Sequence, residues 1–242
     1  MKRSLTLVLA AGLLAPAAQA IELNQNLFLE LNAGLYSDYR TRGISQTQND
    51  PALQGSATLL HGSGLYLGVW GSNVDFATPF DGTRQELDYY AGYYWQISDA
   101  IALDASYIKY VYPGQGDFNY AEYHAELSAY GAFVGGNYSD DMAGDQSYLY
   151  GYAGYRAELP WDLDLELRLG QVDYKDPVFF SNSGDDRDGY REWEAKLSRS
   201  LFELDWSLSY IDTDLSQAEC ASFNGFDDVC SATVLAGVSK TF

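Results

Sequence analysis

The stretch Leu163-Asp-Leu-Glu-Leu-Arg-Leu169 alternates a leucine with a charged residue. A helix would scatter these leucines around its axis. A β-strand places them all on one face and puts Asp164, Glu166 and Arg168 on the other. The stretch therefore predicts a strand with one apolar and one charged face.

The same alternation recurs in twelve segments along the chain. The segments are residues 25–36, 51–61, 64–76, 85–97, 100–112, 119–130, 132–139, 147–158, 163–174, 190–199, 201–212 and 231–242. Most are about 8–13 residues long, which is close to what a tilted strand needs to cross a membrane.

The links between these segments alternate strictly between short and long. The short ones are residues 62–63, 98–99, 131 and 159–162, and a link near 200; the long ones are 37–50, 77–84, 113–118, 140–146, 175–189 and 213–230. Outer-membrane barrels have this arrangement, with tight periplasmic turns and longer external loops. A soluble β-sandwich has no reason to adopt it. We therefore predict an all-β fold, a transmembrane up-and-down antiparallel β-barrel of about 12 strands.

The N-terminus has the features of a secretory signal. Lys2 and Arg3 precede an apolar run at residues 5–14, and Ala18-Gln19-Ala20 fits the cleavage rule for small residues. The run is too short to span a bilayer as a helix. We expect a signal peptide over residues 1–20, a barrel domain over residues 21–242, and export to the outer membrane.

Composition narrows the functional classes. The chain of 242 residues has 34 Asp and Glu against 14 Lys and Arg, a formal net charge of −20. This charge argues against nucleic acid as a partner, because phosphate binding needs a basic face. The apolar fraction of 47% argues against a disordered acidic chain.

The polar faces of the strands carry an excess of acids. The inward-facing acids are predicted to be Glu30, Asp88, Asp104, Glu122, Glu126, Asp164, Glu166, Glu192, Glu194, Glu203 and Asp205; the bases with them are Arg168, Lys196, His124 and Arg156. An acidic pore wall attracts cations and repels anions. The alternative is a plugged interior in which these charges pair with one another.

Catalytic and metal chemistry find little support. His124 lies between Glu122 and Glu126 and could hold a cation, although a luminal polar network is the simpler interpretation. No serine elbow or Ser-His-Asp set is apparent, so we predict no enzyme, no catalytic residues and no cofactor. Residues 181–189 match only part of a calcium loop. We predict a solvated external loop there, and leave open weak divalent binding that bridges to lipopolysaccharide.

The tyrosines and tryptophans suggest two aromatic belts at the membrane interfaces. At the turn side we expect Tyr93, Tyr94, Trp95 and Trp161; at the loop side we expect Tyr36, Tyr39, Tyr110, Tyr112 and Tyr174.

Two features of the C-terminal region fit an exported barrel. Cys220 and Cys230 fall in or beside the last long link, and an oxidising compartment would join them in a disulfide. The terminal Phe242 and the apolar residues of matching parity resemble the signal that the barrel-assembly machinery reads, although Lys240 departs from it.

The first long link and its flanks carry a family resemblance. The motifs are SDYRTRGISQ at residues 37–46, NDPALQG at 49–55, GLYLGVWGSNVDF at 64–76 and ELDYYAGY at 86–93. This region resembles the TorF family of proteobacterial porin-like proteins. The resemblance implies an outer-membrane porin and supplies no substrate.

Arg40 and Arg42 in this motif should lie near the pore mouth. They could set a transverse field and orient an anionic group. Alternatively, they could hold the first loop by pairing with Asp38, Asp75 or Asp88. We expect a passive channel for small hydrophilic solutes or cations, in outer-membrane lipid. The competing hypothesis is a non-conducting receptor, adhesin or structural barrel that acts through its acidic external loops.

Overall fold

The computed structural model describes residues 20–76, 82–142 and 146–242. The predicted signal peptide lies outside the described residues except for Ala20. Within the described part of the chain, no helix is long and apolar enough to cross a membrane.

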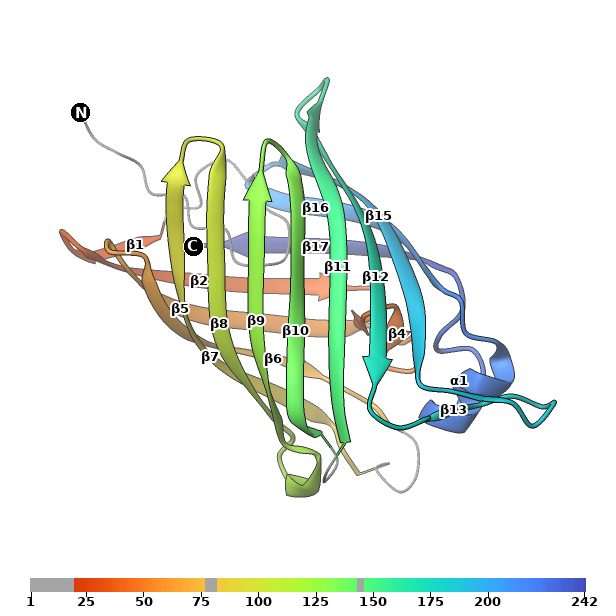
Figure 1. The fold of residues 1–242 in the computed structure, drawn as a ribbon. Coiled ribbons are helices and arrows are strands. Elements are labelled where there is room, and N and C mark those ends of the chain that lie inside the picture. The colour runs from red at the N-terminus through yellow and green to blue at the C-terminus, as the bar shows by residue number, and fades with distance from the viewer. Residues whose placement is uncertain (1–19, 77–81, 143–145) are drawn as a thin grey trace.

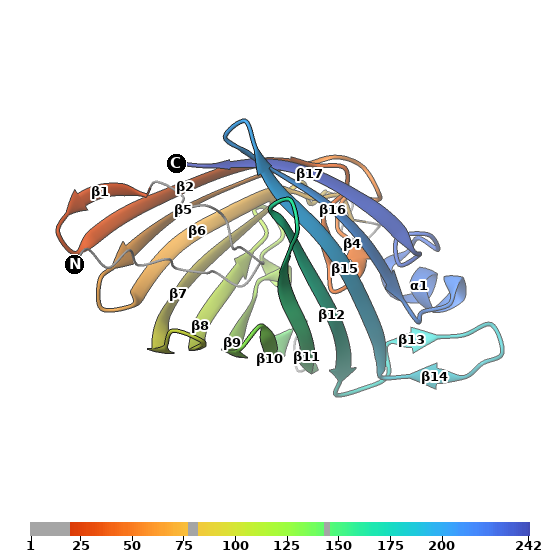
Figure 2. The same cartoon turned by 90° about the horizontal axis from the view of Figure 1, so that it is seen from above.

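Twelve long antiparallel strands form a closed barrel (Figures 1 and 2). They are β2 (Leu27–Tyr36), β5 (Ala52–His61), β6 (Leu65–Asn73), β7 (Gln85–Ser98), β8 (Ile101–Val111), β9 (Tyr120–Ala129), β10 (Ala132–Met142), β11 (Gln146–Leu159), β12 (Leu163–Tyr174), β15 (Gly189–Leu201), β16 (Leu204–Thr213) and β17 (Thr233–Thr241). Each strand pairs with the next, and β17 pairs with β2 from Gly237↔Tyr36 to Thr241↔Asn32. The predicted up-and-down topology is confirmed.

Short elements lie outside this cycle of strands. They are β1 (Ile21–Asn24), β3 (Arg40–Thr41), β4 (Ile44–Ser45), η1 (Gly116–Phe118), β13 (Phe179–Phe180), β14 (Asp186–Arg187) and α1 (Gln217–Asn224). β1 extends the sheet beside β2, whereas β3 pairs only with β4 and β13 only with β14. Residues 181–185 of the segment that partly resembles a calcium loop form the tip of the β13–β14 hairpin, and the next two residues are β14 itself.

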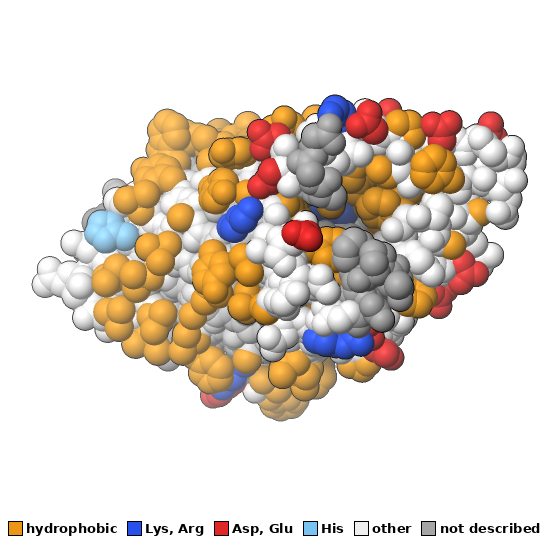
Figure 3. Space-filling model, turned by 90° about the horizontal axis from the view of Figure 1, so that it is seen from below, with side chains coloured by type: hydrophobic (Ala, Val, Ile, Leu, Met, Phe, Trp, Pro, Cys, Tyr) orange, Lys and Arg blue, Asp and Glu red, His pale blue; other side chains and the backbone are white. Residues whose placement is uncertain are grey.

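The side chains alternate as the sequence pattern predicts. On β12, Leu167 and Leu169 are exposed on the outside of the barrel, while Val172 is buried inside. Figure 3 shows hydrophobic side chains gathered at the left of the visible face, whereas most of the charged side chains lie from the middle to the right. Only a closed sheet can present such a surface to lipid without unpaired edge groups.

Tight turns close one end of the barrel. At residues 130–131 and 202–203, both positions of a two-residue link have positive φ, the backbone of the hairpin turn that matches strand twist. Trp161 and Phe202 project from this end and are 78% and 91% exposed. The exposed Tyr93 and Trp95 agree with a turn-side aromatic belt, whereas Tyr94 shares the inward face with Gln96.

The predicted loop-side belt was wrong. Tyr112 is buried and Tyr39 is partly buried, and Tyr36 and Tyr110 line the interior. Tyr174 packs against the buried cluster. The reason is strand parity, because Tyr36 shares a face with Glu30, and Tyr110 and Tyr112 share one with Asp104. These rings fill the lumen rather than contact lipid.

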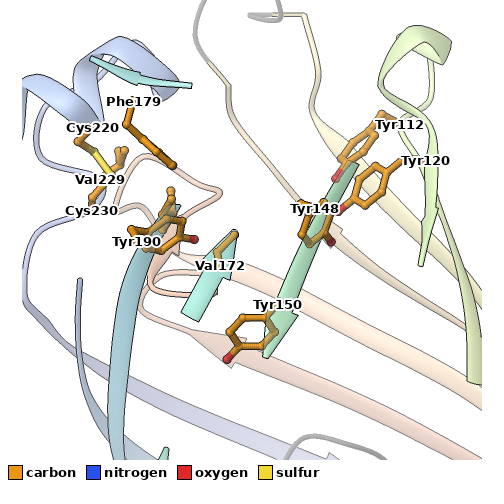
Figure 4. Packing of buried hydrophobic residues seen from close by; sticks show 11 residues of the cluster. Tyr112, Tyr120, Tyr148, Tyr150, Val172, Phe179, Tyr190, Cys220, Val229 and Cys230 are labelled. Carbon is orange, nitrogen blue, oxygen red and sulfur yellow. A yellow bond between two sulfur atoms is a disulfide. The ribbon is translucent and has the colours of Figure 1, made fainter. Parts of the chain in front are cut away.

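The last loop, residues 214–232, is held by the predicted disulfide. Cys220 on α1 is bonded to Cys230, with 5.9 Å between their Cα atoms. α1 begins at a capping box formed by Ser216 and Glu219. Both cysteines are buried with Val229 in a cluster that includes Phe179 and Tyr190 (Figure 4). The staple therefore fixes the last loop against the loop end of the barrel.

Candidate luminal site

A cavity of about 460 Å³ lies inside the barrel. Its lining includes ten of the residues predicted to face inward: Glu30, Asp88, Asp104, His124, Glu126, Arg156, Glu166, Arg168, Lys196 and Asp205. Asp164 shares this inward face at the turn end, opposite Ser198 across the strands. Glu203 does not lie inside. It occupies a tight turn, is largely exposed and pairs with Lys240 at 3.0 Å.

Two arginines in the lumen are engaged by carboxylates. Arg156 contacts Glu126 and Glu166, each at 2.8 Å, and its guanidinium lies 3.9 Å from the Phe133 ring centre. All three charged side chains are largely buried. Because one cation faces two carboxylates, this cluster keeps a negative formal charge.

Arg168 forms a second cluster of the same composition. It lies 3.1 Å from Glu192 and 2.8 Å from Glu194, and Tyr150 donates its hydroxyl hydrogen bond to Glu192. Glu192 is fully buried, so its charge depends on these donors for compensation. The two clusters together form a ladder of opposite charges on strands β9, β11, β12 and β15.

Several luminal charges lie outside this ladder. Glu30 and Asp205 line the cavity without an ion-pair partner among the described residues. Buried oxygen atoms of Asp88 and Asp104, and Nε2 of His124, have no hydrogen-bond partner in the described part of the molecule. The cavity therefore presents acceptors that the protein itself leaves unengaged.

Loop 1, residues 37–51, folds into the barrel and fills the lumen at the loop end. Its β3–β4 hairpin turns at Arg42 and Gly43, both with positive φ. A Cβ on Gly43 would lie 2.5 Å from Thr213 on β16 and 3.2 Å from Glu192 on β15. Glycine is required there by both the backbone conformation and the close approach.

Arg42 anchors the hairpin to the barrel wall. Its guanidinium donates to Glu122 at 2.7 Å and lies 5.0 Å from the ring centres of both Tyr148 and Tyr150. Burial is the largest single effect and opposes its charge, but Glu122, Tyr110 and Tyr120 together outweigh burial and raise the pKa of Arg42 above its ordinary value. Tyr190 donates a hydrogen bond to the Arg42 carbonyl at 3.0 Å. The wall thus holds this loop by ionic, aromatic and polar contacts.

Other contacts hold the base of loop 1. Arg40 pairs with Asp38 at 2.7 Å and donates to the carbonyls of Gly43 and Ser231, each at 2.9 Å. Tyr39 donates to Glu86 at 2.7 Å, and its burial raises the pKa of the phenol well above its ordinary value. Tyr39 therefore stays a neutral donor.

The arginines accordingly hold the first loop rather than line an open mouth. The Arg40–Asp38 pair is one of the pairings that the sequence suggested. Arg42 instead pairs with Glu122, on a strand that the sequence gave no reason to connect with it. Asp75, another proposed partner, pairs with Arg84.

The sequence interpretation missed the aromatic part of this closure. Tyr112, Tyr120, Tyr148 and Tyr190 are buried in one cluster around the inserted loop (Figure 4). The signal was present, because Tyr148 and Tyr150 have the same parity as the inward Arg156. Alternation would have placed them inside had it been applied to tyrosines as strictly as to charges.

Comparisons with known proteins agree with this architecture. A family model described as "Bacterial protein of unknown function (Gcw_chp)" matches residues 23–242. Comparison with curated proteins finds no relative. The chain is similar to a structure described as "Unveiling the Mechanism Behind the in-meso Crystallization of Membrane Proteins", with a TM-score of 0.51 at 11% identity, covering 88% of this chain and 83% of that one.

Two further structures, a porin and an outer membrane protein, have TM-scores below 0.5. The NanC porin has a TM-score of 0.49 at 11% identity, over 88% of this chain and 98% of that one. The outer membrane protein OprD from Pseudomonas aeruginosa has a TM-score of 0.41 at 9% identity, over 91% and 66%.

Proposed function

The chain belongs to the Gcw_chp family of bacterial proteins of unknown function, and from its lumen we propose an outer-membrane channel. The channel passes small hydrophilic solutes or ions by passive diffusion and prefers cations. One observation carries the proposal: a closed barrel combines an apolar exterior with a charged interior cavity of about 460 Å³. No residue is assigned a catalytic role.

The exterior supports a location in the outer membrane. Exposed leucines and aromatics cover the outside of successive strands, and exposed Trp161 and Phe202 mark the turn end. The partners of this surface are membrane lipid and lipopolysaccharide. Phe242, whose backbone pairs with Leu31, is the expected contact for the barrel-assembly machinery. The predicted signal peptide and the resemblance to the TorF family point to the same compartment.

The interior supports a preference for cations. The Arg156 and Arg168 clusters each contain more carboxylates than guanidinium groups. Outside them, Glu30 and Asp205 line the cavity with no paired base among the described residues, and Lys196 is the basic side chain that lines the cavity beside them. A wall of this sign lowers the energy of a cation in the lumen and raises that of an anion.

Loop 1 narrows the pathway at the loop end. Because Arg42, Glu122 and the surrounding tyrosines are buried there, conduction requires a narrow path past the loop or its displacement. The same filling favours the second candidate, a non-conducting barrel that acts through its external loops. The two candidates differ in whether ions cross the folded protein.

The test is single-channel recording in a planar bilayer across a KCl gradient. We expect stable unitary conductance and a reversal potential of the sign given by potassium selectivity. Glu30→Gln and Asp205→Asn should reduce that potential, whereas Glu203→Gln, which removes the same charge from an outer turn, should not. An anion-selective reversal potential would refute the charge argument. Absence of conductance from demonstrably folded barrels would support the second candidate.

A further inference from the structure

Two buried polar side chains in the lumen, Asp104 and His124, each have an atom without a hydrogen-bond partner in the described part of the chain. Asp104 and His124 are only 7% and 8% exposed. Oδ1 of Asp104 accepts from the Tyr66 hydroxyl at 2.7 Å, but Oδ2 has no partner among the described residues. Nε2 of His124 is likewise buried and without a partner. Buried polar atoms normally have partners, so this pair needs an explanation.

The neighbouring side chains determine which His124 nitrogen carries the proton. Asn137 donates from Nδ2 to the Glu122 carboxylate at 2.7 Å, and a carboxylate only accepts. Its other amide atom, Oδ1, therefore faces Nδ1 of His124 at 3.3 Å. An oxygen acceptor there requires a proton on Nδ1. Neutral His124 then has a lone pair on Nε2, which makes this atom an acceptor as well.

Strand register places the two acceptors together. Asp104 on β8 lies opposite Glu126 on β9, and His124 is two residues further along β9. Diagonal neighbours of this kind are roughly 7–8 Å apart at the backbone, so one small group can reach both side chains. Both residues line the same cavity.

The surroundings suit an organic cation. The Tyr66 and Tyr90 rings, 6.3 Å apart, lie on the Asp104 side, and Tyr152 stacks on His124 at 6.5 Å. Aromatic faces stabilise a positive group and its carbon atoms. The carboxylate supplies negative charge, and the two free acceptors require hydrogen-bond donors. A primary ammonium group meets all three conditions.

We propose that Asp104 and His124 form a luminal binding site for the primary ammonium group of a small organic amine. The ammonium donates to Oδ2 of Asp104 and to Nε2 of His124, and its carbon atoms contact the tyrosine rings. The site gives the proposed channel a substrate class, and its role in transport rests on that proposed function. Binding itself requires no conduction.

The test compares two cations of equal formula, charge and near-equal shape. tert-Butylammonium has three N–H donors, whereas tetramethylammonium has none. Each chloride salt is titrated by calorimetry into the protein, expressed from the full chain and purified from bacterial membranes in detergent. We expect tert-butylammonium to bind at least about tenfold more tightly, a difference of about one hydrogen bond to a charged group.

Three variants locate the binding. Asp104→Asn should abolish it, since the new amide supplies its own donor beside His124. His124→Phe should weaken it, because the ring is retained and the acceptor is lost. Glu30→Gln is the matched control, which removes an equal charge from the same cavity. It should weaken both cations alike and leave the ratio of their affinities near that of the parent. Heat-modifiable migration on gels verifies that each variant is folded.

Equal affinity for both cations would overturn the proposal, because it would reduce the effect to charge alone. Unchanged binding in Asp104→Asn, or no binding by folded protein, would also overturn it and leave both acceptors satisfied by hydration. Recording in planar bilayers separates this result from the proposed function. Amine binding without conductance would refute the proposed channel and support the amine site. Conductance without amine binding would refute the amine site and support the channel.

Discussion

Replacing Arg42 with alanine should release loop 1 from the lumen. The substitution removes the donor to Glu122 and leaves a fully buried carboxylate without its counter-charge. Removing one partner of a buried ion pair costs about 3–5 kcal/mol of folding free energy. We add nothing to this range for the lost contacts of Arg42 with the two tyrosine rings. The barrel ladder is not interrupted, so we expect the cost to appear as displacement of the loop and hydration of Glu122.

Two measurements follow this release. Urea unfolding monitored by tryptophan fluorescence should show a lower free energy of unfolding for Arg42→Ala. The decrease should reach about 3–5 kcal/mol if the loop stays in the lumen. Planar-bilayer recording should show larger or more frequent openings, because the displaced loop no longer fills the loop end. Trypsin should cleave the variant within residues 37–51 faster than the parent.

Two further variants identify the cause. Arg42→Ala combined with Glu122→Gln removes the uncompensated charge and should recover part of the lost stability. Arg84→Ala breaks the exposed pair with Asp75 and should cost no more than about 1 kcal/mol. The reasoning is refuted if Arg42→Ala behaves like Arg84→Ala in both assays. It is also refuted if the double variant is no more stable than the single one.

The remaining predictions concern packing and the last loop. Cys220→Ser with Cys230→Ser should leave the barrel folded on gels but expose the last loop to protease, since the staple restrains a loop and not the strand ladder. Gly68→Ala should lower the thermal midpoint, because its Cβ would lie 2.6 Å from the Tyr90 ring and 2.7 Å from a backbone oxygen, a cost of about 1–3 kcal/mol. Gly151→Ala, with open space at the same atom, is the control and should change little. Equal midpoints for the two glycine variants would contradict this account.

The sequence by itself determined the barrel. Alternation at residues 163–169 and in the other segments is a local property, since side chains of a strand point to opposite faces whatever lies beyond it. The alternation of short and long links then specified the up-and-down order. Compartment chemistry predicted the bond between Cys220 and Cys230, because only two cysteines were available. Each of these predictions uses properties that can be read along the chain, without knowing which distant residues meet in space.

The tertiary structure alone decided what fills the barrel. Arg42 and Glu122 are far apart in the chain, and their pairing arises because closure of the sheet brings β9 opposite the inserted loop. The donorless pair at Asp104 and His124 similarly depends on the register of β8 against β9. The alternation along a strand tells which face of the sheet a side chain occupies. It does not tell which side chains meet across the lumen. Those meetings are set by strand register, closure and the path of a loop, which no local pattern encodes.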